Sequence, residues 1–442
     1  MTTRQIEVLI NDQMVGHLRE NDDIWEFEYA AVWVTSPGSF DLSPALPRAQ
    51  ALHRDGATNR PVQWYFDNLL PEETLRTVIA NEADIAAEDA FGMLAHFGSE
   101  SAGSLILRDH DKPVQAEHGL RPLLFAHLSQ RIANLTNVSL SRDAPKRMSL
   151  AGAQHKMLVV FNHSGLFEPL SGTPSTHILK PNHPGDDYPA SVMNEYFTMR
   201  LAKAVGLDVP SVHRLYVPQP VYLVERFDRV LVDHPKPEVQ RRHVIDTCQL
   251  LNKARGFKYK AAHMESLVEA AQRCRFKTAA RFRLYRWLVF NLLAGNSDNH
   301  LKNISFLVDA SGIKLAPAYD MLCTAVYDTK AMANERGRWP ASPLALAIGD
   351  ATTFEGVTRV HVLEAGTALG LAKATATREL DRLVKAVPAE AEMLYRDIES
   401  NIESEMSASP TPQAARAHAA GELQMLRAIK YIVIKDLAKQ LA

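Results

Sequence analysis

The segment GNSDNHLKNISF, residues 295–306, places acidic, amide and basic side chains directly after the apolar run RFRLYRWLVFNLLA. Asp298 and Asn303 are five residues apart, the D-x-x-x-x-N spacing of phosphoryl-transfer loops. A loop with this spacing offers a carboxylate to a substrate hydroxyl and an amide oxygen to a metal ion. Asp also caps many ordinary turns, so this pattern needs support from other parts of the chain.

Other groups with suitable chemistry occur in the order expected for such a site. Asp320 follows the strand-like run KLAPAY, and a hard cation such as Mg²⁺ prefers an oxygen ligand held at a strand end. Lys180 ends the run HILK and could reach nucleotide phosphates, although a lone Lys there is ordinarily a snorkelling residue. Glu195 is a candidate partner of Lys180. Its position is equally consistent with an i,i+4 ion pair on a solvated helix face.

Two further segments could contact a nucleotide. Ser149–Lys156, SLAGAQHK, contains three small residues that let backbone N–H groups approach phosphates, but it has one Gly and resembles a plain strand-entry turn. In VERFDR, backbone groups of residues 225–227 could contact adenine and Asp228 a ribose hydroxyl. A surface Arg–Asp pair is the alternative for Asp228. For His300 we expect a hydrogen-bonding role, because the sequence offers too few further metal ligands around it.

Length and composition predict a protein of two or three domains without a membrane segment. The chain has 442 residues and a formal net charge of -2, so it is not a general polyanion-binding cation. Its three cysteines are far apart and form no C-x-x-C pair, which favours a reducing compartment over a disulfide frame or a zinc site. No signal peptide is visible, and the longest apolar run, WLVFNLLAG, is too short to span a bilayer. We therefore expect a cytoplasmic protein.

Hydrophobic periodicity divides the chain into three expected parts. Residues 1–108 combine a strand meander (6–10, 14–18 and 24–29) with a helix start at 65–73 and a helix–turn–strand at 91–107. Residues 109–230 form a nucleotide-binding part, with strands at 157–161, 177–180, 212–217 and 221–227 and a helix at 191–206. Residues 231–442 are almost entirely helical, with helices at 261–274, 281–295 and 421–442. The Ser- and Pro-rich stretch 406–414 is the clearest linker.

Taken together, these segments resemble the HipA family, the serine/threonine-kinase toxins of bacterial toxin–antitoxin pairs. The stretches that carry the resemblance run in family order: YFDNLLPEE, FGSESAGSLIL, RMSLAGAQHKMLVVF, THILKPN, MNEYFTMRLAKAVGLDVP, VERFDR, GNSDNHLKN and PAYDML. The resemblance implies an α+β, two-lobed protein-kinase-like fold. In that fold a mixed α/β N-terminal part contains a small β-rich module, and the C-terminal lobe is all-helical.

The resemblance also implies roles for individual residues, with ATP and Mg²⁺ as cofactors. Asp298 would be the catalytic residue that positions or deprotonates a seryl or threonyl hydroxyl, and Asn303 and Asp320 would hold Mg²⁺. Ser149 would be phosphorylated by the protein itself, and the added charge would eject its loop and inactivate the kinase. The nucleotide would be bound by Ala151, Gly152, Ala153, Gln154, His155, Lys156, Lys180, Glu225, Arg226, Phe227, Asp228, His300, Lys302, Asn303, Tyr319 and Asp320.

By the same resemblance, the target would be a translation factor such as an aminoacyl-tRNA synthetase, typically the glutamyl enzyme. The partner would be a HipB-like helix-turn-helix antitoxin dimer, which would make most of the contacts to operator DNA. Two departures leave alternatives open: Asp320 is followed by Met321 and Leu322 rather than Phe-Gly, and no H-R-D triplet precedes the loop. The alternatives are a small-molecule or lipid-type kinase, and an inactive kinase-like corepressor that binds a DNA-bound antitoxin.

Overall fold

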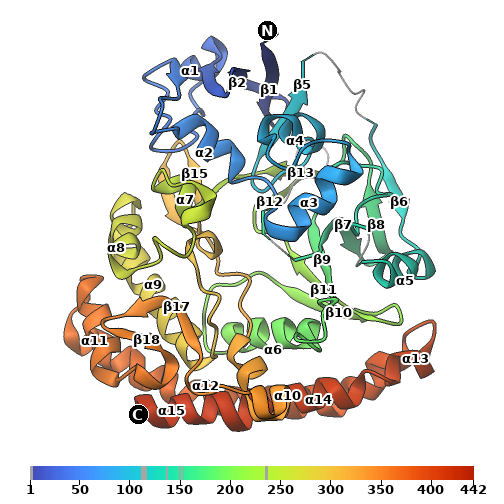
Figure 1. Cartoon of the computed structure of the whole chain (residues 1–442), viewed down its shortest axis with the longest axis vertical. Helices are drawn as coiled ribbons and strands as arrows, with labels where there is room; N and C mark the ends of the chain where they lie inside the picture. The colour runs from blue at the N-terminus through green and yellow to red at the C-terminus, as the bar shows by residue number, and fades with distance from the viewer. Residues whose placement is uncertain (1–2, 111–116, 136–137, 149–150, 153, 234–236) are drawn as a thin grey trace. The chain divides into compact units, whose positions relative to one another are not determined.

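The computed structural model describes residues 3–110, 117–135, 138–148, 151–152, 154–233 and 237–442. Contacts divide the chain into two compact units, whose helices and strands are labelled in Figure 1. Unit 1 comprises residues 1–179, 225–257 and 305–316, and unit 2 comprises residues 180–224, 258–304 and 317–442. Each unit is therefore assembled from segments that are far apart in the sequence.

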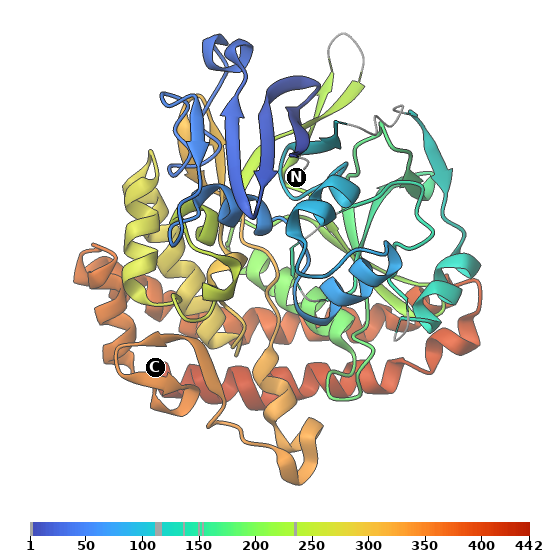
Figure 2. The same cartoon turned by 45° about the horizontal axis from the view of Figure 1, so that its top comes forward.

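The first part of unit 1 is an antiparallel sheet with short helices. Its strand order is β4-β3-β2-β1-β5, and β1, β2 and β3 form the expected meander (Figure 2). Alternate residues of β3 are buried, among them Trp25, Phe27 and Tyr29, so one face of this sheet packs in the core. The elements are β1 (Arg4–Ile10), β2 (Gln13–Asn21), β3 (Ile24–Tyr29), α1 (Ala31–Thr35), β4 (Leu52–Arg54), α2 (Pro61–Asp67), α3 (Glu73–Glu82), α4 (Ala90–Phe97) and β5 (Leu105–Asp109).

The rest of unit 1 contains three further groups of strands. Strands β9, β7, β8 and β6 are neighbours in that order, and β12 pairs with β13. Strand β14 pairs with β15, and β15 pairs with β16. The elements are β6 (Leu120–Pro122), α5 (Phe125–Ala133), β7 (Met157–Asn162), β8 (Gly165–Pro169), β9 (His177–Pro181), β12 (Arg229–Asp233), β13 (Pro237–Arg241), β14 (His243–Asp246), α7 (Thr247–Leu250), η1 (Arg255–Phe257), β15 (Ser305–Asp309) and β16 (Gly312–Leu315).

Unit 2 is mainly helical. The 35-residue helix α12 buries Leu380, Leu383, Val387, Ala391 and Leu394, a spacing of three and four residues that directs one face to the core. It packs against α6, α9, α11 and α15. The main elements are α6 (Ser191–Ala204), β10 (Val212–Tyr216), β11 (Pro220–Glu225), α8 (Met264–Arg273), α9 (Lys277–Leu293), η2 (Leu301–Asn303), η3 (Thr324–Asp328), α10 (Lys330–Ala333), β17 (Pro343–Ile348), β18 (Ala351–Thr353), α11 (Arg359–Ala368), α12 (Lys373–Ser407), α13 (Pro412–Arg416), α14 (Ala419–Ala428), η6 (Ile429–Ile434) and α15 (Lys435–Leu441).

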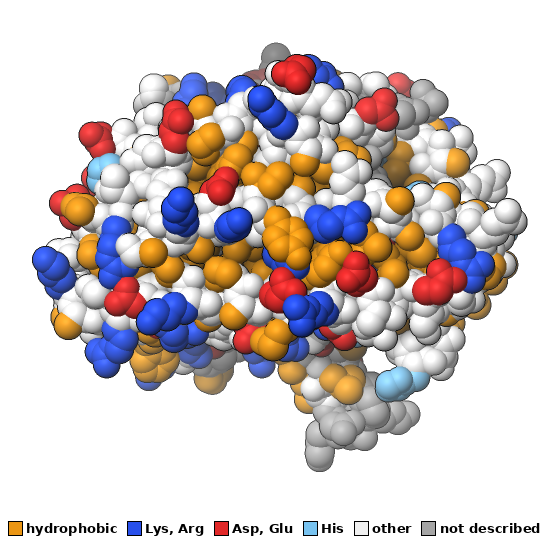
Figure 3. Space-filling model, turned by 90° about the horizontal axis from the view of Figure 1, so that it is seen from below, with side chains coloured by type: hydrophobic (Ala, Val, Ile, Leu, Met, Phe, Trp, Pro, Cys, Tyr) orange, Lys and Arg blue, Asp and Glu red, His pale blue; other side chains and the backbone are white. Residues whose placement is uncertain are grey.

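Helices α12, α14 and α15 run along the lower edge of Figure 1. Figure 3, the view from below, shows a band of apolar side chains on the molecule's surface between flanking charged side chains. Large exposed apolar residues in this part of the chain include Met393 in α12 and Tyr431 in η6, which connects α14 to α15. None of the described helices combines the length and the apolar composition that crossing a membrane requires.

Most elements expected from the sequence are present, and three details differ. The segment 65–73 joins the end of α2 to the start of α3, so a new helix begins only at Glu73. The C-terminal region is helical as expected, but it also contains most of β12 and the short strands β13 to β18, whose few residues give little periodic signal. The expected linker 406–414 contains the last residues of α12, a turn at 408–411 and the first residues of α13, and Met406 within it is buried. The three-part division at residues 108 and 230 stays a prediction.

Candidate active site

The loop that follows α9 begins at a position where the structure favours glycine. Gly295 has φ +67°, and a Cβ atom there would clash with Val433 and press on Ala325 and Cys323. Next to it, the buried Asn296 donates from its side chain to Oδ1 of Asn291 at 2.7 Å, and its backbone N–H donates to the Asn291 carbonyl at 2.9 Å. The end of α9 therefore turns the chain sharply into a loop that is held from inside.

Hydrogen bonds within this loop connect Asp298 to Asn303. The Asp298 backbone N–H donates to Oδ1 of Asn296 at 2.9 Å, and Nδ2 of Asn303 donates to the Asp298 carbonyl at 2.8 Å. The short helix η2 spans the residues between them, Leu301–Asn303. The five-residue spacing recognised in the sequence thus closes a compact loop that carries one carboxylate and one amide.

Lys180 lies between two carboxylates. Its Nζ is 2.8 Å from Oε1 of Glu195, and it also contacts Oδ1 of Asp320. The side chains of Lys180 and Glu195 are 9% and 4% exposed, and that of Asp320 is 35% exposed. Burial alone would lower the pKa of Lys180, but the charges of Asp320 and Glu195 outweigh it and raise that pKa. The lysine is thus charged and held by both acids.

Helix α6 supplies Glu195 and also supports the segment after Asp320. The helix is buried almost all round, which explains why Glu195 needs a charged partner. The neighbouring Asn194 donates from Nδ2 to the Cys323 carbonyl at 2.9 Å, and its Oδ1 accepts from the Cys323 backbone N–H at 2.8 Å. Asp320 itself has φ +57°, a left-handed conformation that is uncommon outside glycine and that Asp tolerates better than most residues.

Asp298 has an unusual electrostatic environment. Its side chain is 42% exposed, and its Oδ1 accepts a hydrogen bond from the Tyr259 hydroxyl at 2.6 Å. Nε2 of His300 is 3.9 Å from the same oxygen. Desolvation and the negative charge of Asp320 raise the pKa of Asp298, whereas His300, the Tyr259 hydrogen bond and Lys258 act in the opposite direction. The two acids, Asp298 and Asp320, are thus close enough for their charges to interact.

The donor set of this region fits a hard divalent cation. Two carboxylates whose charges repel are stabilised by a cation between them, and Asn303 adds an amide oxygen. No cluster of three or more His, Cys, Asp or Glu side chains suited to a metal occurs among the described residues. Mg²⁺ is commonly bound by one or two carboxylates together with substrate phosphates and several waters, so the carboxylate of Asp320 and the amide oxygen of Asn303 are compatible with it.

The expected phosphate loop lies in unit 1. Gly152, with φ +106°, forms a parallel bridge with Pro71, and the Glu72 backbone N–H donates to the Gly152 carbonyl at 3.3 Å. Nζ of Lys156 contacts the Ala151 carbonyl, which closes the loop on itself. Gln154 and His155 are half-buried. Ser149 and Ala153 lie outside the described residues, so their expected roles stay predictions.

Arg226 and Asp228 belong to a buried charge cluster of unit 1. Oδ1 of Asp228 accepts from Nε of Arg226 at 2.9 Å, and Oδ2 accepts from the Gly103 backbone N–H at 2.8 Å. The Arg–Asp pair considered as an alternative is therefore present, but buried rather than at the surface. The proposed ribose contact of Asp228 stays a prediction. Glu225 is exposed, and Phe227 is partly exposed.

The centre of this cluster is Glu100, whose carboxylate is completely buried. Burial would raise its pKa, but the surrounding cations hold the pKa well below its usual range. Its charged partners are Lys146 at 2.6 Å, Arg229 at 2.7 Å, Arg241 at 2.9 Å and Arg226 at 3.3 Å. This cluster joins segments from four regions of unit 1.

The remaining expected site residues also lie in unit 2. Lys302 is buried, and its backbone carbonyl accepts a hydrogen bond from the Tyr319 hydroxyl at 2.7 Å. Tyr319 directly precedes Asp320, so this bond links the Asp298 loop to the Asp320 segment. Unit 2 therefore brings together Lys180, Asp298, His300, Lys302, Asn303, Tyr319 and Asp320, whereas the phosphate loop and residues 225–228 belong to unit 1.

Several supporting residues were not recognised in the sequence. Asn194 and Asn291 sit inside helices, where a single polar residue gives no specific signal. Tyr259 comes from a turn 39 residues before Asp298. Glu100 occurs in a Ser- and Gly-rich segment that reads as a solvated turn, although its side chain is buried. The partners of Asn194, Tyr259 and Glu100 are distant in sequence, so a spacing rule could not find them. The partner of Asn291 is Asn296, five residues away, but no known motif includes this pair.

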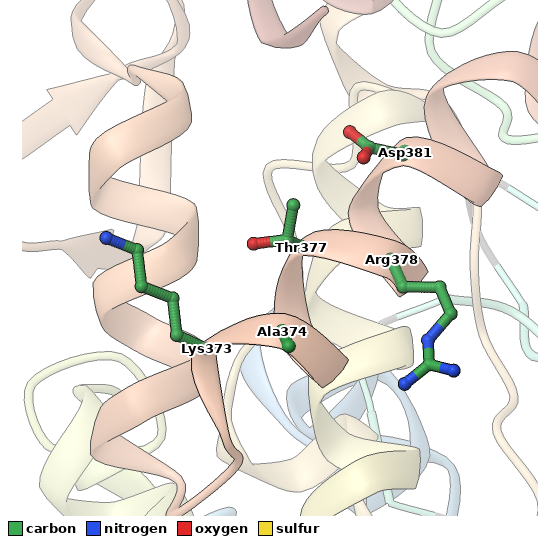
Figure 4. A pocket seen from close by; sticks show the side chains of 5 residues that line it. All are labelled: Lys373, Ala374, Thr377, Arg378 and Asp381. Atoms are coloured by element: carbon green, nitrogen blue, oxygen red, sulfur yellow. The ribbon is translucent and has the colours of Figure 1, made fainter.

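A surface pocket elsewhere in unit 2 shares no residue with this site. Figure 4 shows that it is formed by the first turns of α12, and that Lys373 and Arg378 project from this helix in different directions. Asp381 in the same pocket pairs with Arg359 at 2.5 Å. The pocket is lined by Lys373, Ala374, Thr377, Arg378 and Asp381.

The buried Lys–Glu pair, the D-x-x-x-x-N loop and the following Asp are the parts of a protein-kinase-like fold of the α+β class. Comparisons with known proteins give the family. Residues 6–108 match the HipA N-terminal domain, and residues 148–391, more than half of the chain, match the HipA-like C-terminal domain. This chain belongs to the HipA family, and the expected fold class is confirmed.

Individual relatives agree with this assignment. Protein Y4mE of Sinorhizobium fredii is 33% identical over 88% of this chain and 92% of its own length. The serine/threonine-protein kinase toxin HipA of Shewanella oneidensis is 28% identical over 87% of this chain and 88% of its own length. A solved structure of Shewanella oneidensis HipA with HipB and operator DNA has a TM-score of 0.74 and 25% identity, and the match covers 98% of this chain and 99% of that one.

Proposed function

We propose that this protein is an ATP- and Mg²⁺-dependent serine/threonine protein kinase that acts as the toxin of a HipBA-like toxin–antitoxin pair. The observation that carries the proposal is the arrangement in unit 2. There Lys180 is bound by Glu195 and Asp320, and Asp298 lies on a loop closed by Asn303. The relative named as a serine/threonine-protein kinase toxin supports the reaction class.

In the proposed reaction each residue has a separate task. Asp298 accepts the proton of a seryl or threonyl hydroxyl and orients its oxygen for in-line attack. Lys180 donates hydrogen bonds to nucleotide phosphates, and Glu195 keeps its ammonium group in place. Asp320 and Asn303 would hold Mg²⁺, which when bound neutralises charge that develops on phosphate oxygens. The loop 151–156 and residues 225–228 would contact the rest of the nucleotide.

We further propose that the kinase phosphorylates itself on Ser149 and that this modification inactivates it. A phosphoserine adds nearly two negative charges, which would repel the nucleotide phosphates and displace the loop. For the protein target, an aminoacyl-tRNA synthetase is proposed from the family resemblance alone. A HipB-like antitoxin dimer that contacts operator DNA is proposed because a relative was solved in a complex with HipB and operator DNA.

Labelled ATP tests this proposal. The purified protein is incubated with ATP labelled at the γ-phosphate and with Mg²⁺, and the modified peptide is identified by mass spectrometry. We expect label on the peptide RMSLAGAQHK, no label in Asp298→Ala, and much weaker Mg²⁺-dependent ATP binding in Asp320→Ala. Ser149→Ala should remain active toward a protein target and lose self-inactivation. Full labelling of Asp298→Ala would remove Asp298 from the active site.

Asp320 is followed by Met-Leu rather than the Phe-Gly of protein kinases. Because of this difference, a second candidate function is a kinase of a small molecule or lipid head group. Transfer of label to an added metabolite instead of Ser149 would favour that candidate. A protein that binds a HipB-like antitoxin but neither binds nor hydrolyses ATP would instead be a catalytically inactive corepressor.

A further inference from the structure

Tyr259 contacts the candidate catalytic carboxylate directly, although no part of the D-x-x-x-x-N pattern includes it. Its hydroxyl donates a hydrogen bond of 2.6 Å to Oδ1 of Asp298. Among the described residues, the other carboxylate oxygen, Oδ2 of Asp298, has no hydrogen-bond partner. One oxygen of the carboxylate is therefore engaged by the protein, and the other is left for a second donor.

The Tyr259 ring is itself held by the loop that it contacts. The ring lies edge-to-face against His300, with a centroid distance of 4.9 Å. Nζ of Lys258 lies 5.1 Å from the Tyr259 ring centroid, a favourable cation–π distance. The backbone N–H of Leu301 donates to the Lys258 carbonyl at 3.2 Å and ties the turn to η2. These contacts fix the hydroxyl relative to Asp298 before any substrate arrives.

The terminal torsion of an Asp side chain has a broad energy profile, so a free carboxylate samples many orientations. A hydrogen bond to one oxygen narrows this range and thereby fixes the direction of the other. Phosphoryl transfer depends mainly on positioning, and a displacement of about 1 Å can reduce a rate about 100-fold. A group that orients the carboxylate therefore contributes to the rate even though it never touches the reacting atoms.

We propose that Tyr259 is a positioning residue for the kinase reaction, an inference that rests on the function proposed above. Its hydroxyl holds Oδ1 of Asp298 so that Oδ2 faces the substrate hydroxyl. Asp298 takes the proton from that hydroxyl on Oδ2 while the substrate oxygen bonds to the γ-phosphorus. The bond from the γ-phosphorus to the bridging oxygen breaks, and ADP carries that electron pair away. Tyr259 keeps its own proton throughout.

The alternative role for Tyr259 is inhibitory. In that role its hydroxyl occupies the position beside Asp298 where the substrate hydroxyl would bind. The two assignments predict opposite effects of removing the hydroxyl. Tyr259→Phe removes it and keeps the ring against His300. Because the side chain is 44% exposed, this change leaves the core intact. Tyr431→Phe is a matched control, since Tyr431 is 53% exposed and lies in η6.

The experiment measures the initial rate of self-labelling by γ-labelled ATP over a range of ATP concentrations, together with melting temperature. We expect Tyr259→Phe to lower the maximal rate by about 10- to 100-fold, with unchanged half-saturating ATP and melting temperature. Tyr431→Phe should match the wild type. This pattern separates positioning from a structural role, which would lower the melting temperature, and from a role in nucleotide binding, which would raise the half-saturating ATP.

The other outcomes overturn the inference in distinguishable ways. A Tyr259→Phe rate within twofold of the wild type removes Tyr259 from the reaction. A faster rate assigns the hydroxyl a blocking role. A slower rate accompanied by a lower melting temperature or a higher half-saturating ATP concentration assigns it a structural or binding role. If the wild type itself transfers no phosphate from ATP, the proposed function fails first, and the inference about Tyr259 fails with it.

Discussion

Replacing Lys180 by Met tests whether the charges around it act as one buried network. The side chain of Lys180 is 9% exposed and that of Glu195 is 4% exposed, so the change leaves a buried carboxylate without its counter-charge. Removing one partner of a buried ion pair costs about 3–5 kcal/mol. Glu195→Gln should cost less, about 1–3 kcal/mol, because Lys180 keeps Asp320 as a partner. The loss of unfolding free energy in the double variant should be smaller than the sum of the losses in the two single variants, by about 1–3 kcal/mol.

Urea unfolding followed by far-UV circular dichroism measures these changes, and hydrogen exchange of residues 191–204 localises them to α6. Lys203→Met is the matched control, because Lys203 is an exposed lysine on the same helix and should change stability by less than about 1 kcal/mol. A loss below about 1 kcal/mol in Lys180→Met would refute the argument, and so would strictly additive losses in the double variant. Neither measurement depends on kinase activity.

Three further predictions concern the supports of the site and one acid of unit 1. Gly295→Ala should destabilise unit 2 by about 2–5 kcal/mol in urea unfolding, because the left-handed conformation and the clash with Val433 add; a loss below 1 kcal/mol would contradict this. Asn194→Ala should cost about 2–5 kcal/mol, because two buried backbone groups of Cys323 lose their partner, and Thr198→Ala on the same helix is the milder comparison. Burial raises the pKa of Asp55 from 3.8 to about 6, against hydrogen bonds from the N–H groups of Val62 and Gln63. Its contribution to stability is thus present below pH 4 and is lost as pH rises through 6, by at most about 3 kcal/mol. Asp55→Asn should remove this slope from urea midpoints measured between pH 4 and 7, and an unchanged slope would refute the assignment.

The sequence allowed prediction of those parts of the site that depend on local spacing. The five-residue separation of Asp298 and Asn303 places them on one loop, and the order of strand and helix made Glu195 a candidate partner of Lys180. The contact of Lys180 with Asp320, 140 residues away, was not predicted. The strand β14 was not predicted, because it has four residues and its partner is distant in sequence: His243 pairs with Val308. Tyr259 and Asn194 were missed for a related reason, since each acts on a backbone or side-chain group that only tertiary folding brings near.

Burial also explains why the Arg–Asp pair at Asp228 was considered a surface pair although it lies in the core. Glu100 and Arg226 are charged, and charged residues in a Ser-, Gly- or turn-rich segment ordinarily face water. Here they are buried together, and each is compensated by the other and by neighbouring charges. A charged residue in the sequence therefore indicates an exposed side chain only when the fold provides no buried residue of opposite charge to pair with it.

The ion pairs of Glu100 make the N-terminal and C-terminal segments of this protein dependent on each other, so that neither can be exchanged independently. Glu100 lies in the segment that matches the HipA N-terminal domain, whereas Arg226 and Arg229 lie in the segment that matches the HipA-like C-terminal domain. A fragment that ends at residue 108 would contain the Glu100 carboxylate but none of the four cations that pair with it. A chimera that exchanges either segment with that of a relative should therefore fold stably only when Glu100 and its cations come from the same parent. Fragments 1–108 and 109–442 that are co-expressed should purify as one complex.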